Sequence, residues 1–137
     1  VPHVALAAPK DGREMLALLR TALAHDGGAF ALRYPRDVVP DEALPPMAEI
    51  DAVPYGTWEV LRRGREPGSG PGQAVAILAV GTMVQPAMAA AGALAAEGLY
   101  VTVVNCRFLK PYDEVTLAAL LADHRQLLVV EEGTVVN

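Results

Sequence analysis

Apolar and polar positions alternate in blocks along the first third of the chain. Residues 3–8 form a short apolar run, which predicts a buried strand. The next segment is predicted to be a helix, because its apolar residues recur at helical spacing on one face: Met15, Leu18, Leu19, Ala22 and Leu23. Residues 29–34 then predict a second strand. A strand, a helix and a strand in this order favour a parallel pair joined by a crossover.

Strands and helices alternate again in the second half of the chain. The predicted strands are 74–80, 100–104 and 126–131, and the predicted helices are 87–97 and 113–123. Between the second of these strands and the last helix, residues 105–111 predict a polar connection. The pattern is that of an α/β protein.

Several polar residues stand where a helix N-terminus needs a capping side chain. Asp11 precedes the first helix, and Glu14, three residues later, completes a capping-box-like pair. Thr82 and Asp113 hold the corresponding places before the second and third helices. We therefore interpret all four residues as capping residues first.

The composition changes between the two α/β units. Residues 37–54 carry four prolines among acidic and small residues, which predicts an extended linker that runs over the surface. Residues 55–61 predict a strand with Trp58 as its packing anchor. Residues 62–73 are rich in Gly, Pro and charge but lack the Lys-Ser/Thr ending of a phosphate-binding loop, so they predict a flexible hairpin tip.

Composition and charge narrow the class of protein. The chain has 137 residues, 53% of them hydrophobic, and a net charge of −5, so charge-driven binding of nucleic acid is not expected. A single cysteine, Cys106, excludes an internal disulfide and is interpreted as an inert buried thiol. The histidines lie far apart and predict no metal site, and no apolar span reaches membrane length. Because both ends adjoin core-like strands, we expect a piece of a larger polypeptide.

The motif Arg33-Tyr34-Pro35-Arg36 carries the candidate chemistry. Pro35 fixes its own φ and favours extended backbone at Tyr34, so the two arginines stand on a stiff turn. A guanidinium at the end of a strand is a permanently charged fork suited to phosphate or carboxylate. Taken in isolation, the pair is explained more simply as two exposed arginines flanking a turn.

Five short motifs, in their order and spacing, resemble the 1-deoxy-D-xylulose-5-phosphate synthases of the transketolase superfamily. They are APKDGREM (8–15), RYPR (33–36), VAILAVGTMV (75–84), VNCRFLKPYDE (104–114) and VVEEG (129–133). RYPR and RFLKPYDE are fairly specific to this family, whereas the others are shared with transketolases and with the β subunits of 2-oxoacid dehydrogenases. The resemblance covers essentially the whole chain.

The resemblance implies a domain organisation and a reaction. Residues 1–36 would end a thiamine pyrimidine-binding domain of the parallel α/β type, residues 37–54 would link it, and residues 55–137 would form the first part of a transketolase C-terminal-like domain. The enzyme would be a cytoplasmic homodimeric transferase. It would condense pyruvate with glyceraldehyde 3-phosphate, release carbon dioxide and form 1-deoxy-D-xylulose 5-phosphate, a precursor of isoprenoids, thiamine and pyridoxal.

The resemblance also implies which residues act. The second arginine of RYPR holds the substrate phosphate in this family, which assigns phosphate binding to Arg36 and a weaker, supporting role to Arg33. Asp37 follows Arg36 where many relatives have Gly; it would either hold Arg36 or compete with phosphate. Thiamine diphosphate and Mg²⁺ would be held mainly by other segments of the same enzyme. This segment alone is expected to be inactive, without catalytic, cofactor-binding or metal-binding residues, and to have no nucleic-acid or membrane partner.

Two other interpretations stay open. One is the β subunit of a 2-oxoacid dehydrogenase, against which RYPR argues, and the other is a noncatalytic α/β interaction module. Glu131 and Glu132 resemble an acid/base pair, but adjacent residues of a strand point to opposite faces. We therefore expect a structural or interdomain role for at least one of these two glutamates.

Overall fold

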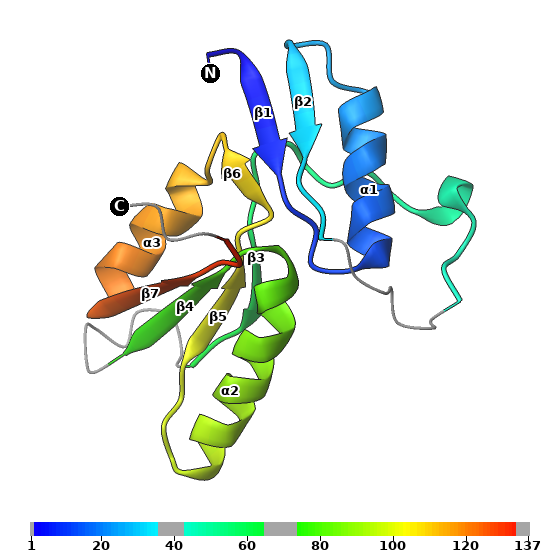
Figure 1. Ribbon diagram of the computed structural model, residues 1–137. Coiled ribbons are helices and arrows are strands. Elements are labelled where there is room, and N and C mark those ends of the chain that lie inside the picture. Colours follow the sequence, from blue (N-terminus) through cyan, green and yellow to red (C-terminus); the bar gives the residue numbers. More distant parts are fainter. Residues whose placement is uncertain (1, 36–42, 65–73, 134–137) are drawn as a thin grey trace.

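The computed structural model describes residues 2–35, 43–64 and 74–133, which form two sheets with helices packed against them (Figure 1). Arg36, Asp37 and the Gly-rich part of the predicted hairpin tip lie outside the described residues. The α/β fold class predicted from the sequence is confirmed.

The first sheet contains the predicted strand–helix–strand unit. β1 (Val4–Ala7) and β2 (Ala29–Leu32) pair in parallel, and α1 (Gly12–Leu23) connects them. The Asp11 side chain accepts a hydrogen bond of 2.7 Å from the backbone N–H of Glu14, which confirms the predicted N-cap.

A third strand, β6 (Phe108–Lys110), pairs antiparallel with the other edge of β1, so the strand order is β2-β1-β6. The polar connection predicted at 105–111 was therefore wrong over three of its residues. Phe108 is fully buried and packs in one cluster with Ala7 and Leu18. The gain from burying this ring, and not a local β pattern, explains why so short a segment is a strand.

The second sheet has four strands in the order β3-β5-β4-β7. Their bounds are β3 (Glu59–Arg62), β4 (Val75–Ala79), β5 (Thr102–Asn105) and β7 (Gln126–Val130). The pairs β4–β5 and β4–β7 are parallel, whereas β3 runs antiparallel to β5. The central strands β4 and β5 are almost wholly buried, as expected for a sheet covered on both faces.

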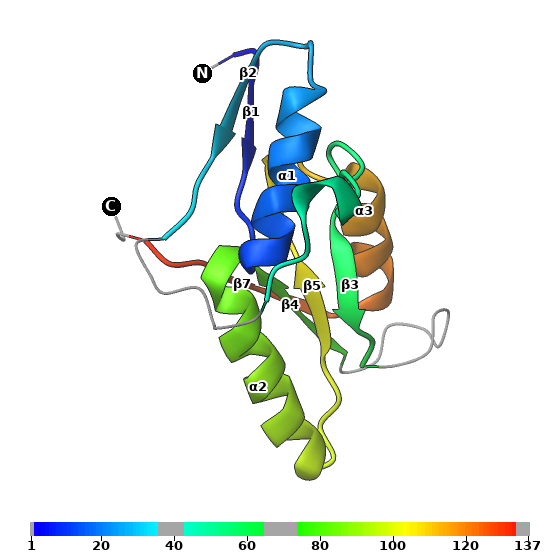
Figure 2. The same ribbon diagram turned by 90° about the vertical axis from the view of Figure 1, so that its right-hand side faces the viewer.

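Two helices cover opposite faces of this sheet (Figure 2). α2 (Val84–Ala96) packs on the face that carries Ile77 and Val103, and α3 (Glu114–Asp123) packs on the face that carries Leu78 and Val104. Because successive strand residues alternate between the faces, one apolar run serves both layers.

The ends of α2 and α3 test the remaining cap predictions. Asp113 accepts a hydrogen bond of 2.9 Å from the backbone N–H of Thr116, so it caps α3 as predicted. The cap predicted at Thr82 was wrong, because Thr82 lies inside a short 3₁₀ helix, η2 (Gly81–Met83), and α2 begins after it. The hydroxyl of Thr82 is instead bonded to Glu132.

The described part of the predicted linker, residues 43–54, runs along α1 and contains a 3₁₀ turn, η1 (Met47–Glu49). Ile50 is 2% exposed, and the Thr21 hydroxyl of α1 donates to the carbonyl oxygen of Val53 at 2.8 Å. Trp58 then anchors the following segment, since its indole N–H donates to the carbonyl oxygen of Phe108 at 2.7 Å.

Candidate functional site

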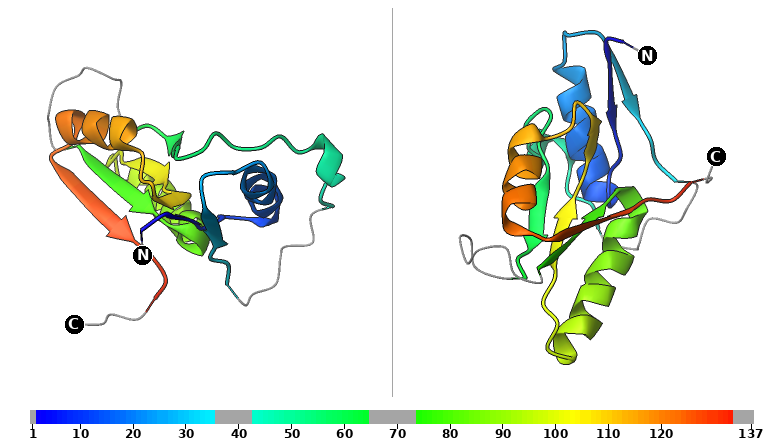
Figure 3. Two further views of the ribbon diagram at one scale, coloured as in Figure 1. Left: turned by 90° about the horizontal axis from the view of Figure 1, so that it is seen from above. Right: turned by 90° about the vertical axis from the view of Figure 1, so that its left-hand side faces the viewer.

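The carboxyl ends of β2 and β7, which belong to different sheets, approach each other in the ribbon views of Figure 3. One cavity lies where these strand ends meet. Its volume is about 440 Å³, and it is lined by residues that directly follow β1, β2, β4 and β7. The polar lining residues include Arg33, Tyr34, Thr82 and Glu132. Ligands of open α/β sheets bind at such carboxyl edges, which makes this cavity the candidate site.

Arg33 is the predicted site residue that the structure places in this cavity. Its backbone N–H donates to the carbonyl oxygen of Ala7 at 2.8 Å, so the pairing between β1 and β2 fixes its main chain. Its guanidinium donates to the carbonyl oxygen of Glu132, and a second nitrogen lies 3.8 Å from the carboxylate of Glu131. Arg36 lies outside the described residues, so its phosphate contact stays a prediction.

The side chains of the two glutamates, which lie just beyond the end of β7, have different partners. Glu131 faces Arg33, whereas the carboxylate of Glu132 accepts a hydrogen bond of 2.9 Å from the hydroxyl of Thr82. Both therefore tie the end of β7 to other elements, which confirms the structural role predicted for at least one of them. The sequence pattern carried no signal that Thr82 was a partner.

Glycines allow the backbones around the cavity to approach one another. Gly81 has φ of +57°, and a Cβ at that position would lie 3.6 Å from the Cβ of Ala8 and from the carbonyl oxygen of Pro9. A Cβ on Gly133 would lie 3.3 Å from a guanidinium nitrogen of Arg33. At Gly81 these distances are ordinary contacts, so the positive φ is what favours glycine there, whereas a side chain at position 133 would press on the Arg33 guanidinium.

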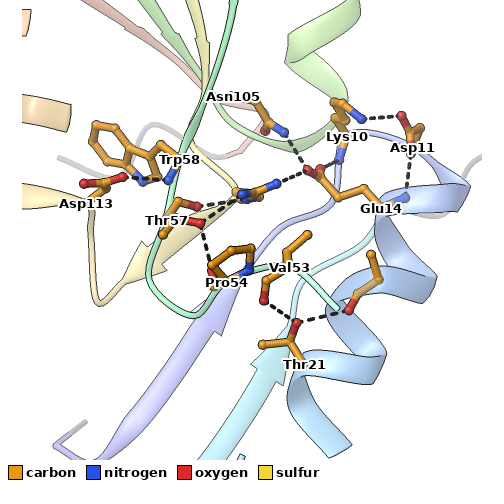
Figure 4. Close-up of polar contacts among 12 residues, drawn as sticks. Lys10, Asp11, Glu14, Thr21, Val53, Pro54, Thr57, Trp58, Asn105 and Asp113 are labelled. Atoms are coloured by element: carbon orange, nitrogen blue, oxygen red, sulfur yellow. Dashed lines mark hydrogen bonds and ion pairs between the residues drawn. The ribbon is translucent and has the colours of Figure 1, made fainter. Parts of the chain in front are cut away.

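A second polar cluster, which the sequence interpretation missed, lies between α1 and the turn from β5 to β6 (Figure 4). Glu14 is 4% exposed; one carboxylate oxygen accepts from the side-chain amide of Asn105 at 2.7 Å and the other from the backbone N–H of Lys10 at 2.7 Å. The guanidinium of Arg107 lies 3.7 Å from the same carboxylate and donates two bonds of 2.9 Å to Thr57. We call Glu14, Asn105 and Arg107 the buried seam.

Burial dominates the electrostatics of the buried seam. It raises the pKa of Glu14, although the hydrogen bonds and the neighbouring cations favour the charged carboxylate. The Oδ1 atom of Asn105 is buried without a hydrogen-bond partner among the described residues. Sequence reasoning assigned Glu14 only to helix capping, because nothing local relates it to a residue 91 positions away.

The remaining observations concern Cys106, metal ligands and membrane spans. Cys106 is buried, as the sequence predicted, and this burial raises the pKa of its thiol to about 12. Within residues 2–35, 43–64 and 74–133, no group of three His, Cys, Asp or Glu side chains is placed to hold a metal ion. None of the described helices is long and apolar enough to span a membrane.

Comparisons of the sequence with known proteins identify relatives along the whole chain. Residues 68–136 match the family of the transketolase C-terminal domain. The chain is 39% identical over 133 residues to a 1-deoxy-D-xylulose-5-phosphate synthase from Lysinibacillus sphaericus, covering 97% of this chain and 19% of the relative. It is 42% identical over 135 residues to that of Alkalilimnicola ehrlichii, covering 98% and 19%. The chain thus spans about a fifth of the length of these curated relatives.

Solved structures share the fold. A split-gene transketolase, described as an inactive β4 tetramer, aligns with a TM-score of 0.71 and 25% identity over 99% of this chain and 41% of its own. A transketolase mutant from Pichia stipitis, solved with fructose 6-phosphate, aligns with a TM-score of 0.66 and 18% identity over 97% of this chain and 19% of its own.

Proposed function

The chain belongs to the transketolase C-terminal domain family, and from this premise we propose that it forms part of a thiamine-diphosphate-dependent 1-deoxy-D-xylulose-5-phosphate synthase. The observation that carries the proposal is the identity of about 40% to curated synthases over nearly the whole chain, including the first unit outside the family match. The complete enzyme would condense pyruvate with glyceraldehyde 3-phosphate and release carbon dioxide.

The proposed domain organisation follows the two sheets. Residues 1–36 would end a pyrimidine-binding domain, residues 37–54 would link it, and residues 55–137 would begin the C-terminal domain. The pairing of β6 with β1 supports a close association of the two domains, because one strand of the later unit completes the sheet of the earlier one. The remaining segments of the same enzyme and a second copy of it would be the partners.

Thiamine diphosphate would supply the carbanion that joins the two substrates. The described residues offer no group of three side chains of the kind that holds its divalent ion. We assign the cofactor and Mg²⁺ to other segments of the enzyme, because the chain spans only about a fifth of the length of its synthase relatives. The contribution of this chain would be to bind and orient the phosphorylated substrate.

Within this proposal, Arg36 holds the phosphate of glyceraldehyde 3-phosphate. A guanidinium offers a planar fork of donors that matches two phosphate oxygens, and its charge does not depend on pH in the working range. The described residues just before Arg36, from Arg33 to Pro35, line the candidate cavity, which supports an active-site position for the motif.

Kinetics of Arg36→Ala in the complete enzyme test the proposal. Loss of a charge-assisted hydrogen bond costs roughly 1.5–3 kcal/mol, which is about tenfold to a hundredfold in kcat/KM for the phosphorylated aldehyde. Pyruvate and unphosphorylated glyceraldehyde should change little, since neither has a phosphate. Arg36→Lys should recover part of the loss, because an ammonium keeps the charge without the fork. Equal losses for the two aldehydes would mean that Arg36 has only a structural role.

A further inference from the structure

The geometry points to a positioning role for Arg33, Thr82 and Glu132, which we name the Arg33 clamp. We propose that this clamp holds the end of β2 against the end of β7 and thereby places the phosphate-binding motif. Arg33 is then a positioning residue and contacts no substrate. The inference rests on the proposed function, because the substrate phosphate is the group whose binding depends on the clamp.

The guanidinium of Arg33 already has partners within the chain. It donates a hydrogen bond to the main-chain oxygen of Glu132, and it faces the carboxylate of Glu131. Both partners are present without any substrate. A phosphate arriving at Arg33 would meet a guanidinium that already donates to this carbonyl and whose charge is partly balanced by a carboxylate 3.8 Å away. These contacts favour a structural use of Arg33 and leave the phosphate to Arg36.

Thr82 and Arg33 both form hydrogen bonds with Glu132. The Glu132 side chain accepts a hydrogen bond of 2.9 Å from the Thr82 hydroxyl, which ties this residue to η2. The ladder between β4 and β7 reaches the last residues before this point, since the N–H of Val80 donates to the carbonyl oxygen of Val130 at 3.0 Å. The carbonyl that accepts from Arg33 therefore lies two residues beyond this ladder bond, on a residue that the Thr82 contact also holds.

Arg33, at the other end of the clamp, is held by the first sheet through its main chain. The Arg33 N–H donates to Ala7 at 2.8 Å and continues the β1–β2 ladder, so the clamp joins two ordered sheet ends that are 99 residues apart in sequence. Gly133 leaves space for this contact. Tyr34 and Pro35 follow directly, and Pro35 restricts the backbone before Arg36. The clamp thus holds the described first residue of the motif whose second arginine the proposed function assigns to the phosphate.

The test uses Thr82→Val in the complete enzyme, because this change removes the hydroxyl while preserving the size and branching of the side chain. The KM for glyceraldehyde 3-phosphate should rise about fivefold, the factor for one hydrogen bond. The kcat, the KM for pyruvate and the KM for unphosphorylated glyceraldehyde should remain near wild type. Inorganic phosphate, used as a competitive inhibitor, should lose affinity by the same factor. Thr82→Ser keeps the hydroxyl and should restore the wild-type KM.

Glu131→Gln is the matched control, since it also lies beside Arg33 but outside the clamp. It removes one negative charge and a contact of 3.8 Å, and it should change the KM for the phosphorylated aldehyde by less than about twofold. If Arg33 were itself a phosphate ligand, removing this competing carboxylate would instead lower the KM, and Thr82→Val would leave it unchanged. Either result overturns the clamp.

A uniform loss also contradicts the inference. If Thr82→Val impaired the phosphorylated and unphosphorylated aldehydes equally, the contact would serve general stability and not phosphate positioning. Failure of the proposed function has a different signature, because the wild-type enzyme itself would then form no 1-deoxy-D-xylulose 5-phosphate from the two substrates. The wild-type assay and the variant comparison thus judge the two proposals separately.

Discussion

The buried seam and the Arg33 clamp both join the first unit of the chain to the second, but they differ in burial and in the partners of their charged groups. The buried seam places Glu14 at 4% exposure beside Arg107, whose side chain is 12% exposed. The Arg33 clamp lies at the surface, where the Arg33 side chain is 49% exposed. Beside the clamp, Arg33 also makes an ion pair with Glu131, whose side chain is 53% exposed. The same kind of ion pair therefore has two different consequences for the protein.

Solvent explains the difference. An exposed ion pair gains little, because water already solvates both charges and holding the side chains costs entropy. A buried pair loses that solvation, so each member depends on its partners and removing one leaves the other uncompensated. We infer that the buried seam governs whether the two units stay together, whereas the exposed clamp adjusts where the end of β2 lies.

Glu14→Ala should produce the largest effect on stability. The change leaves Arg107 largely buried without its carboxylate and removes the acceptor of the Asn105 amide. We expect the free energy of unfolding to fall by about 3–5 kcal/mol, as for other buried pairs that lose one member. Urea denaturation of the chain, followed by circular dichroism, measures this change. A loss below about 1 kcal/mol would mean that the buried seam contributes no more to stability than an exposed ion pair does.

The pH dependence of Glu14 sharpens the comparison, with Glu14→Gln as the matched variant. Burial raises the pKa of Glu14 in the folded chain, so the native state holds this proton more firmly than the unfolded state does. The stabilisation from this group is complete below the unfolded pKa and is lost as the pH rises through the folded pKa. We subtract the unfolding free energy of Glu14→Gln from that of the wild type. This difference should decrease as the pH rises above 4.5, the ordinary pKa of a glutamate side chain.

The subtraction isolates Glu14 from the other carboxylates. Hydrogen bonds lower the pKa of Asp11 and Asp113 against the opposing effect of burial, so these residues contribute stability that is lost as the pH falls. Both residues are present in wild type and variant, and their contributions cancel. Urea titrations of the two proteins across the acidic range give the difference. A difference that grows with rising pH would show that the partners of Glu14 outweigh its burial.

Local signals in the sequence predicted much of the fold. The apolar periodicity of α1, the apolar runs of β4 and β5, and the caps at Asp11 and Asp113 each depend on residues only a few positions apart. The RYPR motif likewise indicated the cavity to which Arg33 contributes. These features are readable because spacing along the chain determines them.

The features that sequence reasoning missed are long-range. β6 has three residues with no β pattern of their own and exists because Phe108 fills the core beside β1. The contact of Thr82 with Glu132 overrides a plausible cap and spans 50 positions. Periodicity says which face of an element is apolar, but not which distant polar group will meet a given side chain.

Arg33→Ala should have the smallest effect on stability, although it removes the central residue of the clamp. The guanidinium is about half exposed, its ion pair with Glu131 is long at 3.8 Å, and its bond to Glu132 can be replaced by water. The free energy of unfolding should therefore fall by less than about 1 kcal/mol. Urea denaturation of the chain, run beside Glu14→Ala, provides the comparison, and Arg33→Lys controls for the loss of charge. If Arg33→Ala proved as destabilising as Glu14→Ala, the clamp would be a second structural seam, and the distinction between holding the units together and positioning the motif would fail.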